Sequence, residues 1–270
     1  YCSTLTSIIV ESGNMVYDSR NNCNAIIETA TNTLIAGCQN TIISNSVISI
    51  GESAFEGCFS LTSIEIPNSV ISIGDYAFDE CSFMTSIKFE ENSQLTSIGD
   101  YAFRDCSSLT SIEIPSFVTF IGDYAFVECS SLTNIEIPNT VTSIGNLAFG
   151  GCLSLINIEI PNSVTSIGEG TFYLCSSLTS IEIPSEVTYI GEYAFEECLS
   201  LTKIYCYAEN VPQTSSDALN ACPSDMVIYV PAQSVGAYKA ASPWNEYTIL
   251  AMPNYEIAVV IAPSESGVVN

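Results

Sequence analysis

The chain has 270 residues, and its 30 acidic and 5 basic side chains give a formal net charge of -25 with no histidine. Five basic residues are too few to neutralise a nucleic-acid backbone or to hold the chain on an anionic membrane, so we expect neither as a partner. The absence of histidine removes the usual general base at neutral pH and the commonest zinc ligand. Mean hydropathy is positive (+0.33), but the longest apolar run has about six residues, so we expect no membrane insertion.

The first sixty residues are irregular. Residues 5–10 match a strand phrase that returns later, so we expect the chain to begin within a coil. In residues 15–38, two apolar pairs at 26–27 and 34–35 flank a polar stretch, and this pattern predicts a hairpin-like insertion. We therefore treat residues 1–60 as irregular N-terminal repeats with an insertion.

The next part of the chain is a repeat. The phrase Ile-Gly-x-x-(Ala/Thr)-Phe-x-x-Cys occurs seven times, and its cysteines are 23 residues apart except for one spacing of 25. The repeating unit is therefore one 23-residue coil. The seven cysteines are Cys58, Cys81, Cys106, Cys129, Cys152, Cys175 and Cys198.

The chain is predicted to change direction several times within one coil. The alternation at 112–114 predicts a short strand that Pro115 ends, and residues 118–121 predict a second extended stretch. Gly122 permits a sharp turn, and residues 123–126 predict a single helical turn with an acidic residue near its start. A single coil cannot bury its own apolar side, so stacked coils must share one core of Leu, Ile, Val, Phe and Cys ladders.

The cysteines allow two interpretations. The seven repeat cysteines stand beside phenylalanine, where a small thiol fills the core, and their parallel side chains disfavour disulfides. Cys206 with Cys222, and Cys23 with Cys38, stand outside that ladder in the sequence, and their pairing stays open.

The C-terminal part departs from the repeat. Residues 226–231 predict a strand, residues 234–241 predict a short helix, and Trp244 follows as the only tryptophan. An open solenoid end exposes core and a sheet edge, so a terminal segment with a large aromatic side chain is expected to cover it. The remaining divisions are therefore regular repeats at 61–200, a C-terminal cap at 201–252, and a tail or the start of a following domain at 253–270.

Each predicted strand carries polar residues on its solvent side, which we expect to be concave. Four glutamates recur once per coil, about 5 Å apart, and like charges at that distance repel by roughly 0.8 kcal/mol per pair in water. Lys88 stands between Glu65 and Glu113 and can relieve both. The candidate partner-binding residues are Glu65, Lys88, Glu113, Glu136, Glu159, Glu182 and Tyr205.

Three interpretations of the glutamate row stay open. It can be a solvated face repeated by gene duplication, or a docking surface for a basic or polyhydroxylated partner. It can also be a weak Ca²⁺ site shared by adjacent carboxylates, although the six to eight oxygens that Ca²⁺ prefers are not evident. No other cofactor is expected.

The turn after each Ile-Gly carries a second acidic column. We expect these carboxylates to offset the positive end of a helical turn. The column is Glu52, Asp75, Asp100, Asp123, Glu169 and Glu192, interrupted by Asn146. One residue later stand tyrosines that either support the core or form a second candidate contact edge. They are Tyr76, Tyr101, Tyr124 and Tyr193.

The phrases SLTSIEIP-x-x-V-T-x-IG-x-x-AF-x-x-C between Leu61 and Leu201 resemble the BspA-like leucine-rich repeat family. The segment from Val230 to Trp244 also looks like the closing segment of that family. The resemblance implies an α/β, β-dominated leucine-rich repeat solenoid of right-handed coils, with short parallel strands, single helical turns and capping segments. It also implies a bacterial cell-surface or secreted protein with a role in adhesion.

Catalysis is not expected. Glutamates about 5 and 10 Å apart match the spacing used in glycoside hydrolysis, but an open face of identical carboxylates offers neither enclosure nor asymmetric pKa values. The sequence therefore predicts a non-catalytic, monomeric recognition module for an extracellular protein or glycan. The alternative is a passive spacer that presents a neighbouring domain.

Overall fold

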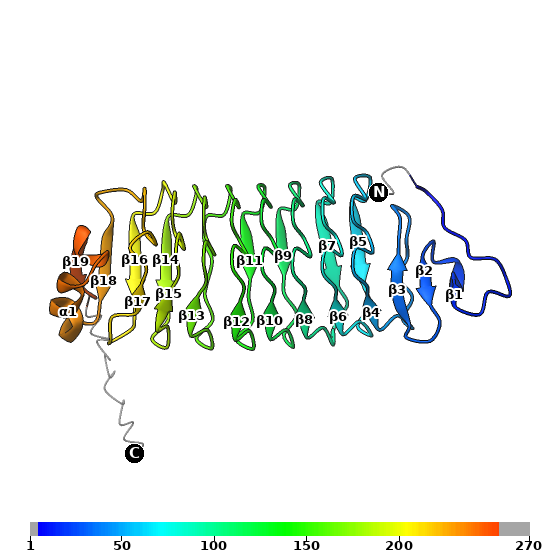
Figure 1. Ribbon diagram of the computed structural model, residues 1–270, viewed down its shortest axis with the longest axis horizontal. Coiled ribbons are helices and arrows are strands. Elements are labelled where there is room, and N and C mark those ends of the chain that lie inside the picture. Colours follow the sequence, from blue (N-terminus) through cyan, green and yellow to red (C-terminus); the bar gives the residue numbers. More distant parts are fainter. Residues whose placement is uncertain (1–4, 254–270) are drawn as a thin grey trace, which may run out of the picture.

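A computed structural model describes residues 5–253, which form one solenoid of about nine coils. Figure 1 shows the coils following one another in a nearly straight row, from the N-terminal hairpin at one end to helix α1 at the other. The predicted leucine-rich repeat solenoid, built mostly of parallel strands with little helix, is confirmed. The tail predicted from residue 253 lies outside the described residues except for Pro253.

The main strand row is formed by the Ile-x-Ile phrases. The row is divided among three hydrogen-bonded sheets, and within each sheet neighbouring strands pair in register, for example Ile112 of β9 in parallel with Ile135 of β11. Coil 157–160 contributes only a single bridge, from Glu159 to Glu182. The strands of this row are β5 (Ser63–Ile66), β7 (Ser86–Phe89), β9 (Ser111–Glu113), β11 (Asn134–Glu136), β14 (Ser180–Ile183), β16 (Lys203–Cys206), β18 (Val227–Val230) and β19 (Thr248–Ala251).

A second row of two-residue strands runs beside the first. It contains the extended stretch predicted at 118–121, which appears as β10 (Phe120–Ile121). Each strand places one isoleucine or threonine toward the interior, and neighbouring strands pair in parallel within two separate sheets that divide between residues 144 and 166. The other strands are β4 (Ser49–Ile50), β6 (Ser72–Ile73), β8 (Ser97–Ile98), β12 (Ser143–Ile144), β13 (Ser166–Ile167), β15 (Tyr189–Ile190) and β17 (Gln213–Thr214).

The N-terminal end of the second row is an antiparallel extension. Strand β1 (Tyr17–Asp18) pairs with β2 (Ile26–Glu28), which pairs with β3 (Thr33–Ala36), and β3 joins β4 in parallel. A short 3-10 segment, η1 (Arg20–Asn22), lies between β1 and β2.

The strand expected at residues 5–10 does not form. The adjacent part of the first coil, residues 39–43, carries no strand either, so the segment has no ladder to join. It is held instead by side chains, including a hydrogen bond from the amide of Asn40 to the Thr6 carbonyl.

The prediction of a helical turn at residues 123–126 is wrong. Tyr124 has a φ of 58°, in the left-handed region, and this segment is a series of tight turns. Backbone N–H groups in this segment donate to the next coil, as from Tyr124 to Asn146 and from Phe126 to Ala148. A third inter-coil ladder therefore replaces the expected helical hydrogen bonds.

The acidic column at this turn edge has a different role from the one predicted. The Asp100 N–H donates to the Asp75 carboxylate (2.9 Å), and the Asp123 N–H donates to the Asp100 carboxylate (2.8 Å). Asn146 continues the series rather than interrupting it, because its side-chain oxygen accepts from Glu169 (2.9 Å). These side chains tie one coil to the next, and no helix dipole is involved.

The glycine before this column is needed for close approach. Gly122 does not have a positive φ, so the sharp turn does not explain it. A Cβ on Gly145, the equivalent residue of the next coil, would come 2.4 Å from the Asp123 nitrogen. Only glycine lets the coils stack closely enough to make the carboxylate ladder.

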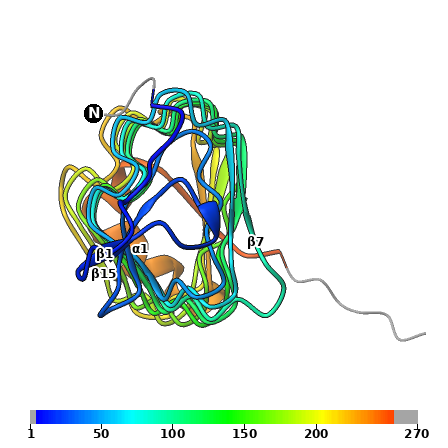
Figure 2. The same ribbon diagram turned by 90° about the vertical axis from the view of Figure 1, so that its right-hand side faces the viewer.

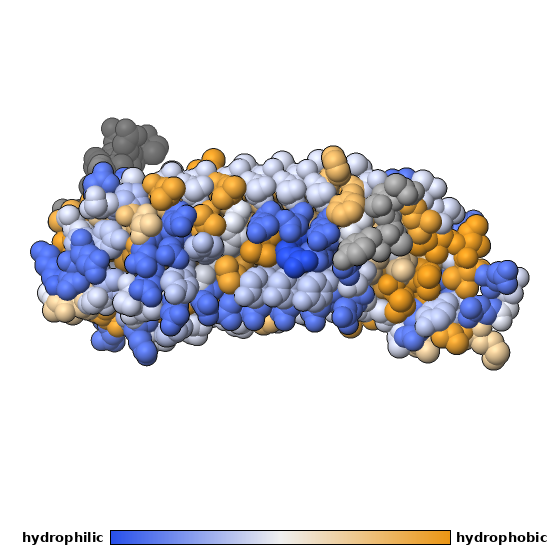
Figure 3. All heavy atoms as spheres, turned by 45° about the horizontal axis from the view of Figure 1, so that its top comes forward, coloured by the Kyte–Doolittle hydropathy of each residue, from blue (hydrophilic) through white to orange (hydrophobic). Residues whose placement is uncertain are grey.

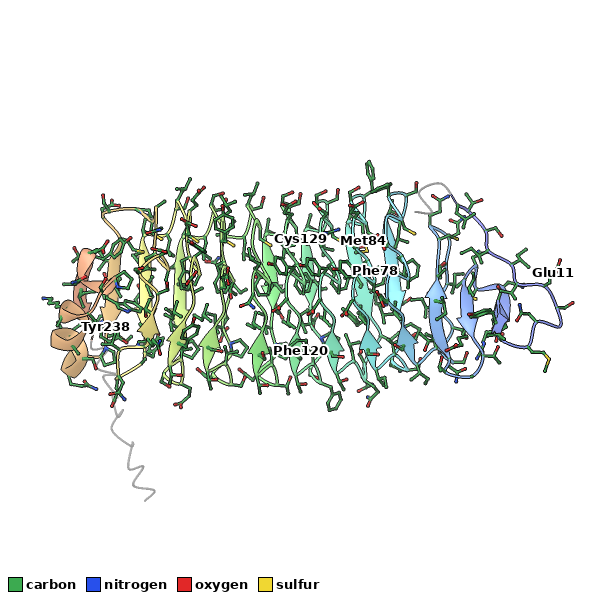
Figure 4. The ribbon with its side chains drawn as sticks, in the orientation of Figure 1. Glu11, Phe78, Met84, Phe120, Cys129 and Tyr238 are labelled. Carbon is green, nitrogen blue, oxygen red and sulfur yellow. The ribbon has the colours of Figure 1, made fainter. Side chains whose placement is uncertain are left out.

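The core consists of side-chain ladders. The phenylalanine rings from Phe55 to Phe195 stack with centroids 5.0 to 5.8 Å apart. Figure 4 shows Phe78 and Cys129 inside the column of coils. The Cys129 thiol donates to the Phe103 carbonyl (3.1 Å), and burial raises its pKa well above the ordinary value.

The thiols of the described residues form no disulfide. Cys222 belongs to the ladder after all, because its thiol donates to the Phe195 carbonyl (3.2 Å) just as the repeat cysteines do. Burial raises its pKa to about 12. Cys206 instead contacts the Tyr238 hydroxyl (3.2 Å), and both Cys23 and Cys38 are free and buried.

The C-terminal end is closed by aromatic packing. Tyr238 and Trp244 are fully buried and meet edge to face at 5.1 Å. The Trp244 indole N–H donates to the Thr214 hydroxyl (3.0 Å), which ties the segment to the last coil. The predicted helix and strand are confirmed as α1 (Val235–Ala240) and β18, flanked by η2 (Ala232–Ser234) and η3 (Trp244–Glu246).

The outer surface is uneven. Figure 3 shows hydrophobic side chains gathered toward the N-terminal end, where Ile9, Met15 and Ile42 are all more than 70% exposed. Among the described residues, none of the helices has the length and apolar character that a bilayer span requires.

Candidate binding surface on the strand face

The strand face is the solvent side of the main strand row. Period-two alternation buries Ile112 and Ile135 and turns Glu113 and Glu136 outward. Glu113 pairs in register with Glu136, and Glu159 bridges Glu182. Four exposed carboxylates therefore stand on successive coils, and we call Glu113, Glu136, Glu159 and Glu182 the glutamate row.

One cross-coil ion pair lies next to this row. The Lys88 ammonium is 2.6 Å from a carboxylate oxygen of Glu65, with both side chains largely exposed. The hydrogen bond and charge of Glu65 raise the pKa of Lys88. Lys88 therefore offsets the negative charge of Glu65 and not that of Glu113, its other acidic neighbour. No ion pair within residues 5–253 involves the glutamate row.

The C-terminal end of the row is aromatic. Tyr205 is paired in register with Glu182 on one side and Tyr229 on the other, and the two rings stack at 4.9 Å. The Tyr207 hydroxyl donates to the Glu182 carboxylate (3.2 Å). Sequence reasoning selected Tyr205 but missed Tyr207 and Tyr229, although Tyr229 stands in the Ile228-Tyr229-Val230 strand phrase.

Two shallow hollows follow the strand face. One is lined by residues 134–137, 157–159 and 180–182, and the other extends from Ile87 to Pro138. Both hollows include Glu136 and Ile137, so they meet. We call the combined depression the strand-face trough, and it brings together Lys88 and the whole glutamate row.

The longer coil gives this trough a wall. Residues 89–94 contain the two extra residues that make the cysteine spacing 25, and Figure 2 shows the corresponding loop beside β7 standing out beyond the superposed coils. The exposed Phe117 of the next coil lies in the same hollow as this loop. Sequence reasoning found the spacing but selected neither the loop nor Phe117.

The tyrosine edge is only partly assembled. Tyr76, Tyr101 and Tyr124 stack at 4.8 and 4.5 Å, so their ring faces cover one another. Leu147 and Gly170 occupy the next two coils, and Tyr193 stands apart from the stack. The stack therefore presents ring edges rather than an open aromatic platform.

Arg104 fixes the tyrosine stack. Its guanidinium lies 5.5 Å from the Tyr101 ring centroid and binds the Asp79 carboxylate through two hydrogen bonds of 2.7 and 2.6 Å. The Asp79 side chain is only 1% exposed. Burial raises the pKa of Asp79, and Arg104 opposes that rise. This edge is thus occupied by interactions that serve the fold.

The chemistry available on the strand face is that of exposed carboxylates, amides and hydroxyls. Residues 5–253 contain no group of three Cys, Asp or Glu side chains placed to hold a metal ion. The trough is open and repeats the same carboxylate, so it offers charge and a periodic array of acceptors. Such a surface can bind a partner of complementary charge.

The architecture of stacked 23-residue coils with a polar strand face is that of a leucine-rich repeat solenoid. Residues 32–130 and 96–226 match the BspA-type leucine-rich repeat region in six copies. The chain belongs to the BspA-type leucine-rich repeat family. No relative is found among the curated proteins.

Solved structures support this assignment. A leucine-rich cell-surface protein of Faecalibacterium prausnitzii is 27% identical with a TM-score of 0.63, over 85% of this chain and 72% of that one. A leucine-rich repeat protein of Treponema pallidum is 30% identical with a TM-score of 0.57, over 72% and 91%. A Bacteroides ovatus repeat protein, 22% identical over 83% and 71% with a TM-score of 0.52, shares the fold.

Proposed function

We propose that this protein is a non-catalytic recognition module, displayed on or secreted from a bacterial cell, that adheres to a basic protein through the strand-face trough. The observation that carries the proposal is the glutamate row: four exposed carboxylates on successive coils, paired in register two by two, without a basic partner in residues 5–253. The similar F. prausnitzii protein is described as a cell-surface protein, which supports the location.

The charge of the row favours a cationic partner. Neighbouring carboxylates about 5 Å apart repel by roughly 0.8 kcal/mol per pair in water, and a partner's lysine or arginine would turn that repulsion into attraction. The Lys88–Glu65 pair shows this cross-coil contact within the chain itself. A neutral glycan would leave the repulsion in place, so a basic protein is the better fit.

The scaffold suits such a role because it is preorganised. The residue before each glutamate is a buried isoleucine, and each glutamate pairs in parallel with that of a neighbouring coil, Glu113 with Glu136 and Glu159 with Glu182. A partner therefore meets a fixed array of charges, and little conformational entropy is lost on the module's side of the interface. Solenoids commonly use extended surfaces of this kind for binding.

The test is a binding screen against extracellular-matrix proteins, mucins and glycans, with the native chain and a variant carrying Gln at 113, 136, 159 and 182. We expect saturable binding to basic proteins that the variant loses and that weakens as salt rises. Selective binding to neutral glycans, or binding that survives in the variant, would contradict the proposal. Absence of binding throughout would favour the spacer function instead.

A further inference from the structure

We propose that the N-terminal part of the trough is an anchor pocket for one large apolar side chain, and that the partner segment is a helix carrying this residue beside basic residues spaced one per turn. We call this pocket, formed by Phe89, loop 90–93, Pro115, Phe117 and Pro138, the notch. The inference rests on the proposed function and adds the form of the partner.

The notch exists because two coils break the repeat side by side. In three other coils the residue equivalent to Phe117 is a hydroxyl residue that bonds back to the preceding coil: Ser69 to the Val47 carbonyl, Thr140 to the Val118 carbonyl and Ser163 to the Val141 carbonyl. Phenylalanine cannot make this bond, and Phe117 is 52% exposed. An apolar ring thus stands at the trough where those three coils place a hydrogen-bonded hydroxyl group.

The opposite wall is held firmly. The Glu90 carboxylate accepts from the Asn68 N–H (3.1 Å), and the Gln94 N–H donates to the Asn68 carbonyl (3.2 Å). Phe89 is half-buried at the base of this loop. The fixed loop and the apolar side chains of Phe89, Pro115 and Phe117 therefore form a preorganised notch, where apolar surface adjoins the acidic trough.

The occupant must combine apolar and basic chemistry. Glu113 and Glu136 line the same hollow as the notch, and the glutamate row continues from there to Glu182. A segment seated in the trough would place an apolar residue against Phe117 and cations over successive carboxylates. Lys88 does not compete for this row because it is paired with Glu65.

The spacing of the row favours a helix over an extended strand. Three strand intervals from Glu113 to Glu182 span about 14 Å. Three helical turns rise about 16 Å, a mismatch that flexible lysines can absorb. Alternate residues of an extended chain would span about 20 Å over the same three steps, so their cations would lose register with the row.

The test uses two synthetic helical peptides with one lysine on each of four successive turns. One carries leucine a turn before the first lysine, and the other carries alanine there. We expect the leucine peptide to bind the native chain about tenfold more tightly than the alanine peptide. The Phe117→Ser variant carries the serine that stands at the equivalent positions 69 and 163. It should bind the two peptides equally, and its affinity for the alanine peptide should be that of the native chain.

A second variant removes the wall while keeping the ring: deletion of Glu91 and Asn92 returns this coil to 23 residues and should also abolish the leucine advantage. Equal binding of both peptides to the native chain, or a leucine advantage that survives both variants, would overturn the notch. A proline-interrupted peptide that binds as tightly would overturn the helical form. Failure of the alanine peptide to bind at all would overturn the proposed function and this inference with it.

Discussion

The strand face and the turn edge both repeat an acidic residue once per coil, but the two columns differ in what the carboxylates contact. At the turn edge, Asp75, Asp100 and Asp123 each accept a backbone N–H of the next coil. On the strand face, Glu113, Glu136 and Glu159 are exposed, and the structure records no ion pair to them in residues 5–253. The same repetition thus serves folding at one edge and leaves charge free for recognition at the other.

This difference shows how to separate structural from functional repetition. Where folding uses the column, from Asp75 to Asn146, the side chain has a specific acceptor geometry, and Asn146 takes an aspartate position with its bond intact. A column that folding does not require tolerates neutralisation and carries a small repulsive cost instead. Stability measurements on matched variants can therefore show whether folding requires each column.

The largest expected effect is at the turn edge, where Arg104→Met leaves the buried Asp79 carboxylate without its cation. We expect a loss of about 3 kcal/mol in the free energy of unfolding at pH 7.5, measured by urea denaturation. Burial already raises the pKa of Asp79, and losing Arg104 raises it further. The Asp79 carboxyl therefore binds its proton more tightly in the folded variant than in the unfolded chain. The loss in the free energy of unfolding is full above the raised pKa and becomes smaller as pH falls below it.

A control for this variant is Arg104→Met combined with Asp79→Asn, which has no carboxyl to titrate. When pH falls from 7.5 to 4.5, the difference in the free energy of unfolding between this double variant and the native chain should not become smaller. A deficit in the single variant that is equal at both pH values would show that Asp79 is not the group responsible.

The second effect concerns close stacking of the coils. Gly145→Ala would place a Cβ 2.4 Å from the Asp123 nitrogen, so we expect a loss of about 2 to 3 kcal/mol. Gly236→Ala is the matched control, since it meets no atom within 4 Å and lies in α1. That control should be neutral or slightly stabilising. Equal thermal stability of both variants would contradict the stacking explanation.

The third effect tests the carboxylate ladder itself. Asp123→Ala removes the acceptor of the Asn146 N–H (2.7 Å) and should cost about 1 kcal/mol. Asp123→Asn keeps an acceptor oxygen and should cost much less, as Asn146 does naturally in the next coil. If alanine and asparagine were equivalent by chemical denaturation, the ladder would contribute nothing.

The smallest effect on stability is expected on the strand face. Neutralising Glu113, Glu136, Glu159 and Glu182 with glutamine removes their mutual repulsion, so the free energy of unfolding should stay level or rise by less than about 1 kcal/mol. A clear loss of stability in this variant would mean that the glutamate row has a structural role. It would remove the contrast between the strand face and the turn edge.

Most of the coil was predictable because burial follows local sequence. The alternation around Ile112, the Phe and Cys columns, and the closing role of Trp244 all depend on apolar side chains that must leave water. Cys222 escaped detection because Leu219 replaces the usual phenylalanine of the phrase, although the thiol still bonds the preceding coil.

The turn edge and the notch were not predictable from one coil alone. The residues at 123–126 suit a helical turn locally, but inter-coil hydrogen bonds favour a left-handed Tyr124 instead. The Asp123 bond to Asn146 depends on stacking register, which no single coil encodes. The notch needs a long loop in one coil and Phe117 in the next, so only their juxtaposition reveals it.

The most direct test of the recognition surface compares two variants with the same loss of charge. One has glutamine at Glu113, Glu136, Glu159 and Glu182, and the other neutralises Glu52, Asp75, Asp100 and Asp123 to their amides. Affinity for the lysine-bearing helical peptide is measured for both at one salt concentration. We predict that the strand-face variant loses binding while the turn-edge variant keeps it, whereas an equal loss in both would show that only net charge matters.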